Sequence, residues 1–225
     1  MGKPLSLTAA DAHKLGAYRA DPAGQSRGGV VVVQEIFGVN HHIRSVCDRL
    51  AALGYSAVAP AVFDRFVRDF ETGYSPDEIA KARGYLGSID WDAMVRDVAA
   101  GVDLLRPSGK VSVIGFCMGG TMAYLAATRI DGLAASVCLY GGQIVKHADT
   151  KPRCPTQMHF GDRDASIPMS DVEIIKQKRG ADCDIYVYAG AQHGFCCDER
   201  ESFNAESAAI AWARAIRFLD KAMGK

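Results

Sequence analysis

The sequence predicts an α/β fold, in which a mainly parallel central sheet carries helices on both faces. Short runs rich in valine and other β-branched residues alternate along the chain with helical patterns. This alternation is typical of parallel sheets that are covered on both sides. The 225 residues, of which 48% are hydrophobic, are also enough to build a substantial core.

The first half of the chain predicts two strands and two helices. The valine-rich run at 28–38 is too short for a helix and is predicted as a central strand, and 55–63 is the next. Between them, residues 40–54 carry apolar side chains at helical spacing and end at a glycine. A second helix is predicted over 90–106, with Asp90 as its N-cap.

The second half of the chain continues the alternation. The predicted strands lie within 110–116, 134–142, 155–164 and 184–195. The predicted helices are 118–129, 169–178 and 203–225. No repeat, low-complexity tract or linker interrupts the sequence, so we predict a single domain over residues 1–225.

Residues 64–89 break this pattern. The segment is polar, aromatic and charged, and it lies between a predicted strand and a predicted helix. We therefore predict a cap-like excursion over the C-terminal edge of the sheet, where active sites of open α/β sheets collect.

Charge and composition exclude several classes of function. Lys+Arg 26 balance Asp+Glu 26 without a block of like charges, so we expect neither nucleic acid nor a membrane as partner. The start of the chain lacks the apolar core of a signal peptide, and no apolar run is long enough to span a bilayer. The seven cysteines include no C-x-x-C pair, which predicts a reducing, cytoplasmic location. Cys47 and Cys138 lie in apolar segments and are expected to be buried.

The stretch VIGFCMGG, residues 113–120, carries the main chemical signal. Gly115, Cys117 and Gly119 fit the spacing of a nucleophile elbow between a strand and a helix. The glycines let the strand and the helix pass closely beside a strained nucleophile. The N–H of Met118 and the positive end of the helix would then face the reacting oxygen and favour the thiolate. An inert tight turn is the alternative.

An acid and a histidine follow the elbow in the order that an α/β hydrolase requires. The strand within 155–164 ends in a turn that carries Asp162 and Asp164. A later strand, within 184–195, ends at Gly190, and His193 follows in a loop before the last helix. Either aspartate could instead cap the next helix, and a loop histidine could be solvated. Three elements in the right order favour the triad Cys117, His193 and Asp164.

Together these stretches resemble the dienelactone hydrolase (carboxymethylenebutenolidase) family of α/β hydrolases. The resemblance covers nearly the whole chain, through VVVQEIFG, LAALGYSAVAP, VIGFCMGG, HFGDRDASIP, AGAQHGF and the last helix. It implies the α/β-hydrolase fold, hydrolysis of a small ester or enol-lactone, and no metal or organic cofactor. It also implies a Cys–His–Asp triad, which maps onto Cys117, His193 and Asp164, the second aspartate of GDRD.

The resemblance also gives the stretch QEIFG a role. In the family, its glutamate reaches the nucleophile and the next backbone N–H completes the oxyanion hole. This implies Glu35 as a catalytic proton partner of the thiol, and the amides of Ile36 and Met118 as the oxyanion hole. The alternative is that Glu35 only closes a strand end and accepts backbone hydrogen bonds.

The substrate-binding residues match the family less completely. The family implies two arginines that hold a substrate carboxylate, one in the excursion and one after the catalytic histidine. Here Cys197 stands near the second position, and Lys81 lies four residues before Tyr85, where the first arginine is expected. Arg83 is a second candidate. Lysine lacks the planar fork of arginine, so dienelactone itself is not assured as a substrate.

Other residues near these motifs complete the substrate-binding prediction. Tyr140, at a strand end, and Phe37, beside Ile36, are expected to bind substrate. Arg200 could reach the position of the missing second arginine, but it is expected to be a solvated arginine at a helix start. Cys196 and its neighbour would make a poor chelate and a strained disulfide, so we expect no metal there.

The histidines outside the proposed triad carry little signal. His41 and His42 are expected to begin the first helix, and no partners are identified for His13, His147 and His159.

The sequence thus predicts a hydrolase that acts on a small ester or lactone through a thioester on cysteine. A broader carboxylesterase or thioesterase, and a ligand-binding protein without turnover, are the alternatives. The oligomeric state is left open as a monomer or a small homo-oligomer.

Overall fold

In the computed structural model, residues 2–224 are described, and the chain divides into two compact units, residues 1–113 and 114–225. Hydrogen bonds order the strands as β1-β2-β4-β3-β5-β6-β7-β8, and β5 (Val111–Phe116) contributes to both units. The sheet is mixed but mostly parallel and has flanking helices, which confirms the predicted α/β fold. Among the described residues, no helix is both long and apolar enough to cross a membrane.

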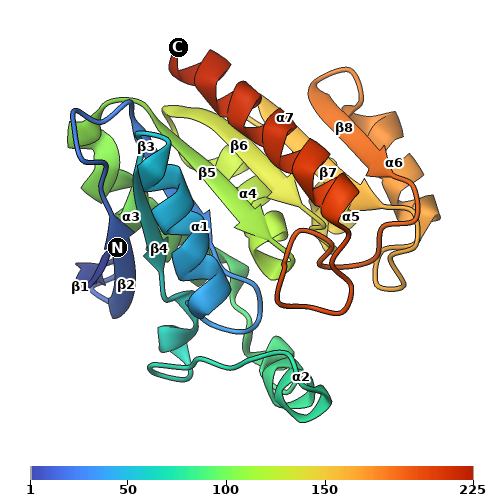
Figure 1. The fold of residues 1–225 in the computed structure, drawn as a ribbon, viewed down its shortest axis with the longest axis horizontal. Coiled ribbons are helices and arrows are strands. Elements are labelled where there is room, and N and C mark those ends of the chain that lie inside the picture. Colours follow the sequence, from blue (N-terminus) through green and yellow to red (C-terminus); the bar gives the residue numbers. More distant parts are fainter. Residues whose placement is uncertain (1, 225) are drawn as a thin grey trace. The chain divides into compact units, whose positions relative to one another are not determined.

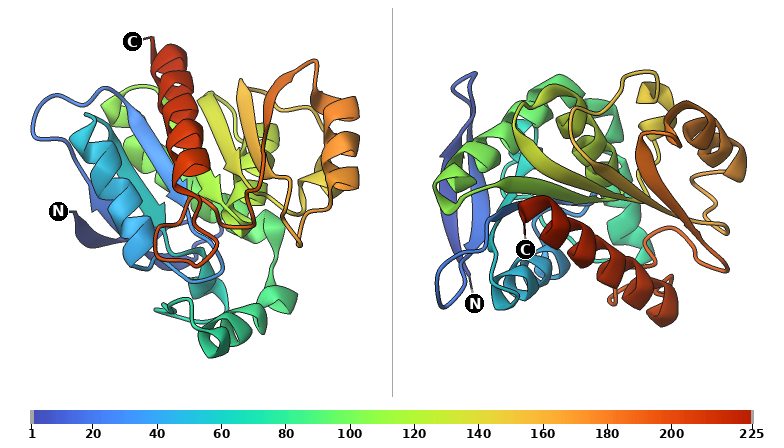
Figure 2. Two further views of the ribbon diagram at one scale, coloured as in Figure 1. Left: turned by 45° about the vertical axis from the view of Figure 1, so that its right-hand side comes forward. Right: turned by 90° about the horizontal axis from the view of Figure 1, so that it is seen from above.

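The first unit is built on four strands and three α-helices. The strands are β1 (Lys3–Thr8), β2 (Lys14–Ala20), β3 (Gly29–Val33) and β4 (Ser56–Pro60). The helices are α1 (His41–Ala52), α2 (Pro76–Arg83) and α3 (Trp91–Leu105). β3 and β4 run parallel, and α1 and α3 lie on opposite faces of these strands (Figures 1 and 2).

The hairpin of β1 and β2 was not predicted from the sequence. The two strands pair antiparallel with each other, and β2 pairs antiparallel with β4. Most of their side chains are exposed or only half-buried, so the apolar alternation that marks a strand is weak.

Residues 64–89 contain a helix that was not predicted. α2 begins with a capping box, in which the Ser75 hydroxyl accepts from the Glu78 N–H and the Glu78 carboxylate accepts from the Ser75 N–H. Pro76 occupies the first turn, where its missing N–H costs nothing. The signal Ser-Pro-x-Glu was present in the sequence, but the helix has only 8 residues.

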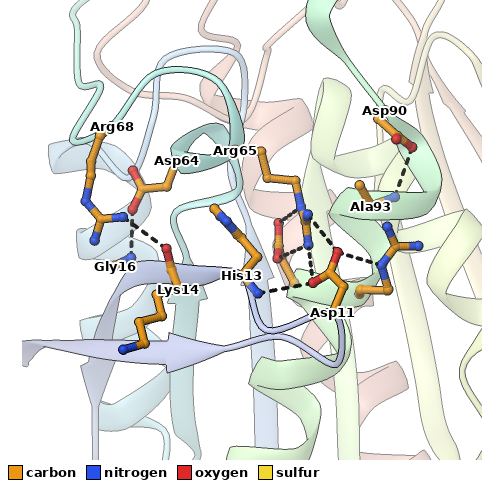
Figure 3. A network of polar contacts seen from close by, with 11 residues as sticks. Asp11, His13, Lys14, Gly16, Asp64, Arg65, Arg68, Asp90 and Ala93 are labelled. Atoms are coloured by element: carbon orange, nitrogen blue, oxygen red, sulfur yellow. Dashed lines mark hydrogen bonds and ion pairs between the residues drawn. The ribbon is translucent and has the colours of Figure 1, made fainter.

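Charged side chains at the start of this segment bind other parts of the first unit (Figure 3). Arg65 binds Asp11, in the β1–β2 turn, at 2.9 Å and the fully buried Asp97 of α3 at 2.7 Å. Burial raises the pKa of Asp97, while the Arg65 guanidinium acts in the opposite direction. Asp64 accepts hydrogen bonds from the N–H groups of Gly16 and Asp69. The segment therefore starts from a rigid base.

The second unit continues the sheet with three parallel strands after β5. These are β6 (Leu133–Leu139), β7 (Thr156–Gly161) and β8 (Cys183–Tyr188). The helices are α4 (Met118–Arg129), α5 (Ile144–His147), α6 (Met169–Arg179) and α7 (Ala205–Met223). α7 lies on one face of the strands, with α4 and α6 on the other (Figure 2).

The predicted elements of the second unit are present with adjusted ends. β8 stops at Tyr188, two residues before the predicted end at Gly190, and His193 lies in the loop that follows, as predicted. α7 begins at Ala205 because the Asn204 side chain accepts from the N–H of Ser207. The predicted end of this helix, residue 225, lies outside the described residues. The thiols of Cys47, in the first unit, and Cys138 are buried, as predicted.

Candidate active site

Cys117 occupies a strained turn between β5 and α4. Its φ of 56° and ψ of −117° are unusual for a residue with a side chain. Its N–H donates to the carbonyl of Leu139 in β6 at 3.0 Å, which fixes the turn to the sheet. A Cβ on Gly115 would collide with the carbonyl of Gly119, so the crossing of strand and helix requires glycine there. The predicted elbow geometry is present.

α4 leaves this turn directly, so Cys117 is its N-cap. The Cys117 carbonyl accepts from the N–H of Gly120 at 2.9 Å, which closes the first turn. The Met118 N–H therefore belongs to the N-terminal turn, where backbone donors and the helix dipole favour negative charge. Cys117 is only half-buried and thus accessible to a ligand.

The Asp164 carboxylate is buried and uses both of its oxygens. Oδ2 lies 2.7 Å from Nδ1 of His193. Oδ1 accepts from the N–H groups of Ser166 and Ile167, at 2.8 and 3.1 Å. Asp162 instead accepts from the N–H of Gly190 at 2.7 Å. Of the two candidate aspartates, the structure brings Asp164 to the histidine.

His193 lies between this carboxylate and the cysteine. Because Nδ1 faces Asp164, Nε2 is the nitrogen left for the side-chain hydrogen bond with Cys117. Burial disfavours the charged imidazolium, but the negative charge of Cys117 and the hydrogen bond to Asp164 outweigh it. The result is a pKa of His193 raised to about 10. At neutral pH this shift favours the protonated imidazolium of His193, which lies between Asp164 and the Cys117 sulfur.

Tyr140, which is predicted to bind substrate, contacts the histidine ring. Its φ of 39° turns the chain sharply after β6, and its N–H donates to the carbonyl of His159. The Tyr140 ring meets His193 edge-on at 5.2 Å and Phe195 at 5.5 Å between centroids. These aromatic contacts limit the freedom of the imidazole.

The loop after His193 corrects one expectation. Arg200 precedes α7 and is half-buried, so it is not a solvated arginine at the start of a helix. The backbone N–H of Cys197 donates to the carbonyl of Gly194 at 2.9 Å, and the backbone N–H of Arg200 donates to the carbonyl of Cys197 at 3.2 Å. These turns place the Arg200 guanidinium against Gly194. A Cβ added to Gly194 would collide with it. A cationic side chain thus lies beside the residue that follows His193.

Glu35, Ile36 and Phe37 lie in the first unit, in the connection from β3 to α1, and all three are buried. The Tyr74 hydroxyl donates to Oε2 of Glu35 at 3.4 Å and accepts from the Asn40 amide at 2.9 Å. The ring of Tyr74 also packs against Phe37 at 4.7 Å. Sequence reasoning missed Tyr74, although it lies in the aromatic excursion.

Two of the three predicted substrate residues in the excursion contact the same ring, that of Phe70. The Tyr85 ring packs against Phe70 at 5.0 Å and Phe66 at 5.8 Å. The Lys81 ammonium lies over the Phe70 ring at 5.6 Å, within the range of a cation–π contact. Arg83 is exposed in the last turn of α2.

Comparison with known proteins gives consistent matches. The model of the Dienelactone hydrolase family matches residues 15–223. A provisionally named carboxymethylenebutenolidase of Synechocystis sp. is 38% identical over 220 residues, which cover 89% of each chain. The carboxymethylenebutenolidase of Pseudomonas putida is 30% identical over 96% of this chain and 94% of that protein. A provisionally named dienelactone hydrolase from Klebsiella pneumoniae has a crystal structure with a TM-score of 0.84 and 29% identity, covering 97% of this chain and 98% of that one.

Proposed function

The chain belongs to the dienelactone hydrolase family, and from this we propose that it hydrolyses a small ester or enol-lactone through a thioester on Cys117. The observation that carries the proposal is the series of contacts from Cys117 through His193 to Asp164. The naming of the Pseudomonas putida relative as a carboxymethylenebutenolidase supports a lactone as the substrate class.

In the first half of the reaction, the Cys117 sulfur attacks the carbonyl carbon and a C–S bond forms. The electron pair of the carbonyl moves to its oxygen, which the amides of Met118 and Ile36 would bind. Collapse of this species breaks the bond to the leaving oxygen, and His193 donates its Nε2 proton to that oxygen. The raised pKa of His193 supports this role, because the imidazolium is present at the start.

In the second half, neutral His193 takes a proton from water, whose oxygen adds to the thioester carbon. Collapse breaks the C–S bond, releases the carboxylic acid and restores the thiolate beside the imidazolium. Asp164 keeps the Nδ1 proton in place throughout, because its Oδ2 accepts from that nitrogen. We assign Glu35 the role of proton partner: it takes the proton of the resting Cys117 thiol when substrate binds and returns it after the acid has left, and Tyr74 donates a hydrogen bond to Glu35.

The substrate class follows from the nucleophile and from nearby charge. A thiolate expels enolate or phenolate leaving groups more readily than alkoxides, so activated esters and enol-lactones are favoured. Lys81, Arg83 and Tyr85 are proposed as substrate contacts from the excursion, and Tyr140 and Phe37 as walls of the pocket. Lys81 and Arg83 would supply positive charge for a substrate that carries a carboxylate.

The proposal is tested by turnover of cis-dienelactone, trans-dienelactone and p-nitrophenyl acetate. We expect the wild type to hydrolyse at least one of them and Cys117→Ala to lose turnover. Cys154→Ala is the matched control, because this half-buried thiol precedes β7 and lies outside the proposed triad. Its rate should equal that of the wild type.

The pattern of rates separates the alternatives. Hydrolysis of p-nitrophenyl acetate alone, lost in Cys117→Ala, identifies a broader carboxylesterase or thioesterase with the same nucleophile. Full activity of Cys117→Ala would overturn the mechanism. Stabilisation of the protein by these compounds without hydrolysis would instead indicate a ligand-binding member of the fold.

A further inference from the structure

We propose that Tyr188 and His159 are positioning residues, which hold the turn that carries Asp164 and the loop that carries His193 in one fixed arrangement. Neither residue touches the reacting atoms. The inference rests on the proposed function in one respect, because it takes the Asp164–His193 pair as the catalytic acid and histidine.

Tyr188 ends β8 and makes three separate connections. Its carbonyl accepts from the N–H of Asp162, in the turn that leads to Asp164, at 3.1 Å. Its ring packs on Phe195, two residues after His193, at 5.1 Å between centroids. Its hydroxyl lies 2.8 Å from Nδ1 of the buried His159. One residue therefore joins the acid turn, the histidine loop and the sheet interior.

The protons along this network have only one consistent order. Arg214 of α7 donates to the Tyr188 hydroxyl oxygen at 3.2 Å, and arginine has no acceptor to offer. Oε1 of Gln157 can only accept, so Nε2 is the donor of the neutral His159 ring and Nδ1 accepts the proton of Tyr188. Nε2 of His159 therefore carries the ring proton and donates to Oε1 of Gln157 at 2.9 Å. Every hydrogen bond in the series has a defined direction.

His159 stays neutral in this network. It is fully buried, and burial together with the charge of Arg214 lowers its pKa to about 3. The series of hydrogen bonds is therefore intact across the pH range in which the enzyme would work. This hydrogen-bond network therefore holds its geometry over that range and does not act as a pH switch.

Backbone contacts join the turn that carries Asp164 to the loop that carries His193. The N–H of Gly190 donates to the Asp162 carboxylate at 2.7 Å, and the N–H of Arg163 donates to the carbonyl of Ala191 at 3.0 Å. A Cβ on Gly161 would collide with that same carbonyl, so the turns approach as closely as backbone allows. The turn and the loop are thus joined to each other, and the Tyr188 hydroxyl links them to His159 of β7 and Arg214 of α7.

Loss of the Tyr188 hydroxyl should therefore change the position of His193 more than the stability of the protein. Without it, β8 and the turns joined to it lose their link to His159 and Arg214, and His193 can move relative to Cys117. Small misplacements of catalytic groups cost up to about a hundredfold in rate. Substrate binding should change little, because Tyr188 is buried behind Phe195.

The test compares Tyr188→Phe with Tyr186→Phe. Both remove one hydroxyl from β8 and keep the ring, but the Tyr186 ring serves as a stacking surface for Arg214 at 4.1 Å. We expect Tyr188→Phe to lower kcat by about ten- to a hundredfold with KM unchanged. We expect Tyr186→Phe to match the wild type in both.

A nuclear magnetic resonance titration of His193 supplies the readout that a purely structural role would not move. A loosened hydrogen bond to Asp164 supports the imidazolium less, so the pKa of His193 in Tyr188→Phe should fall below its value of about 10. His159→Gln should show the same fall, and the double variant should add little to either single variant.

Three results would overturn the inference. They are a kcat equal to that of Tyr186→Phe, an unchanged His193 titration, and additive effects of the two substitutions. A lower melting temperature with normal kcat would assign the network to stability alone. If the wild type hydrolyses no ester, the proposed function fails, whereas the titration still decides whether Tyr188 positions His193.

Discussion

The two aspartates of GDRD show how one side chain's surroundings decide its role. Asp164 accepts two backbone N–H groups with one oxygen and faces Nδ1 of His193 with the other. Asp162, two residues earlier, accepts from the Gly190 N–H. Sequence order alone favoured Asp164 but left both open, because the direction of a turn side chain depends on the backbone of its neighbours.

Replacement of each aspartate by asparagine tests this difference. Asp164→Asn keeps the shape but presents a neutral amide to Nδ1, so we expect kcat to fall by about 10³- to 10⁴-fold. Asp162→Asn should lose far less, because its amide oxygen can still accept from Gly190. Measurement of kcat for both variants checks the assignment, and equal losses would contradict it.

Other residues of the site were visible from sequence only in part. Cys117 and His193 stand where the elbow and the strand order predict, because local spacing determines both positions. Tyr74 and Arg200 reach their partners through turns that have no apolar periodicity. Arg200 in particular depends on two consecutive backbone hydrogen bonds after Gly194, which no spacing rule anticipates.

At the level of secondary structure, the buried strands and long helices were predictable, and the surface elements were not. β3 and β5 are buried along their whole length and read as nearly continuous apolar runs. The β1–β2 hairpin depends on strand pairing, and the short helix α2 depends on capping. Hydrophobic periodicity reveals neither of them. His159, for which the sequence suggested no partner, has two within β7 and β8.

His159 should also make the folding of β7 and β8 sensitive to acid. Its pKa is about 3 in the folded chain and near 6.5 when unfolded, so the unfolded chain binds the proton first as pH falls. The stabilisation is complete above about pH 6.5 and is lost progressively toward pH 3. By pH 5 the expected loss is about 2 kcal/mol of unfolding free energy.

Urea unfolding between pH 7.5 and pH 5 measures this effect. We expect the unfolding free energy of the wild type to fall more steeply over this range than that of His159→Gln, which cannot take up the proton. Parallel curves for the two proteins would show that His159 does not couple folding to pH.

On the scale of the whole chain, the family is established while the chemistry is proposed. The family model covers residues 15–223, and relatives at 30% and 38% identity extend over most of the sequence. The second unit alone holds Cys117, Asp164 and His193, whereas Glu35 and the excursion belong to the first. The single domain over residues 1–225 and the cap over the site stay predictions.

The acyl-enzyme is the species that tests the central claim most directly. The wild type should be mixed with p-nitrophenyl acetate, quenched in acid within the first turnover, digested, and analysed by mass spectrometry. The mechanism predicts one acetyl group per chain, attached to Cys117, with a matching burst of nitrophenolate. Turnover without a label on Cys117, or with the label on another residue, would contradict it.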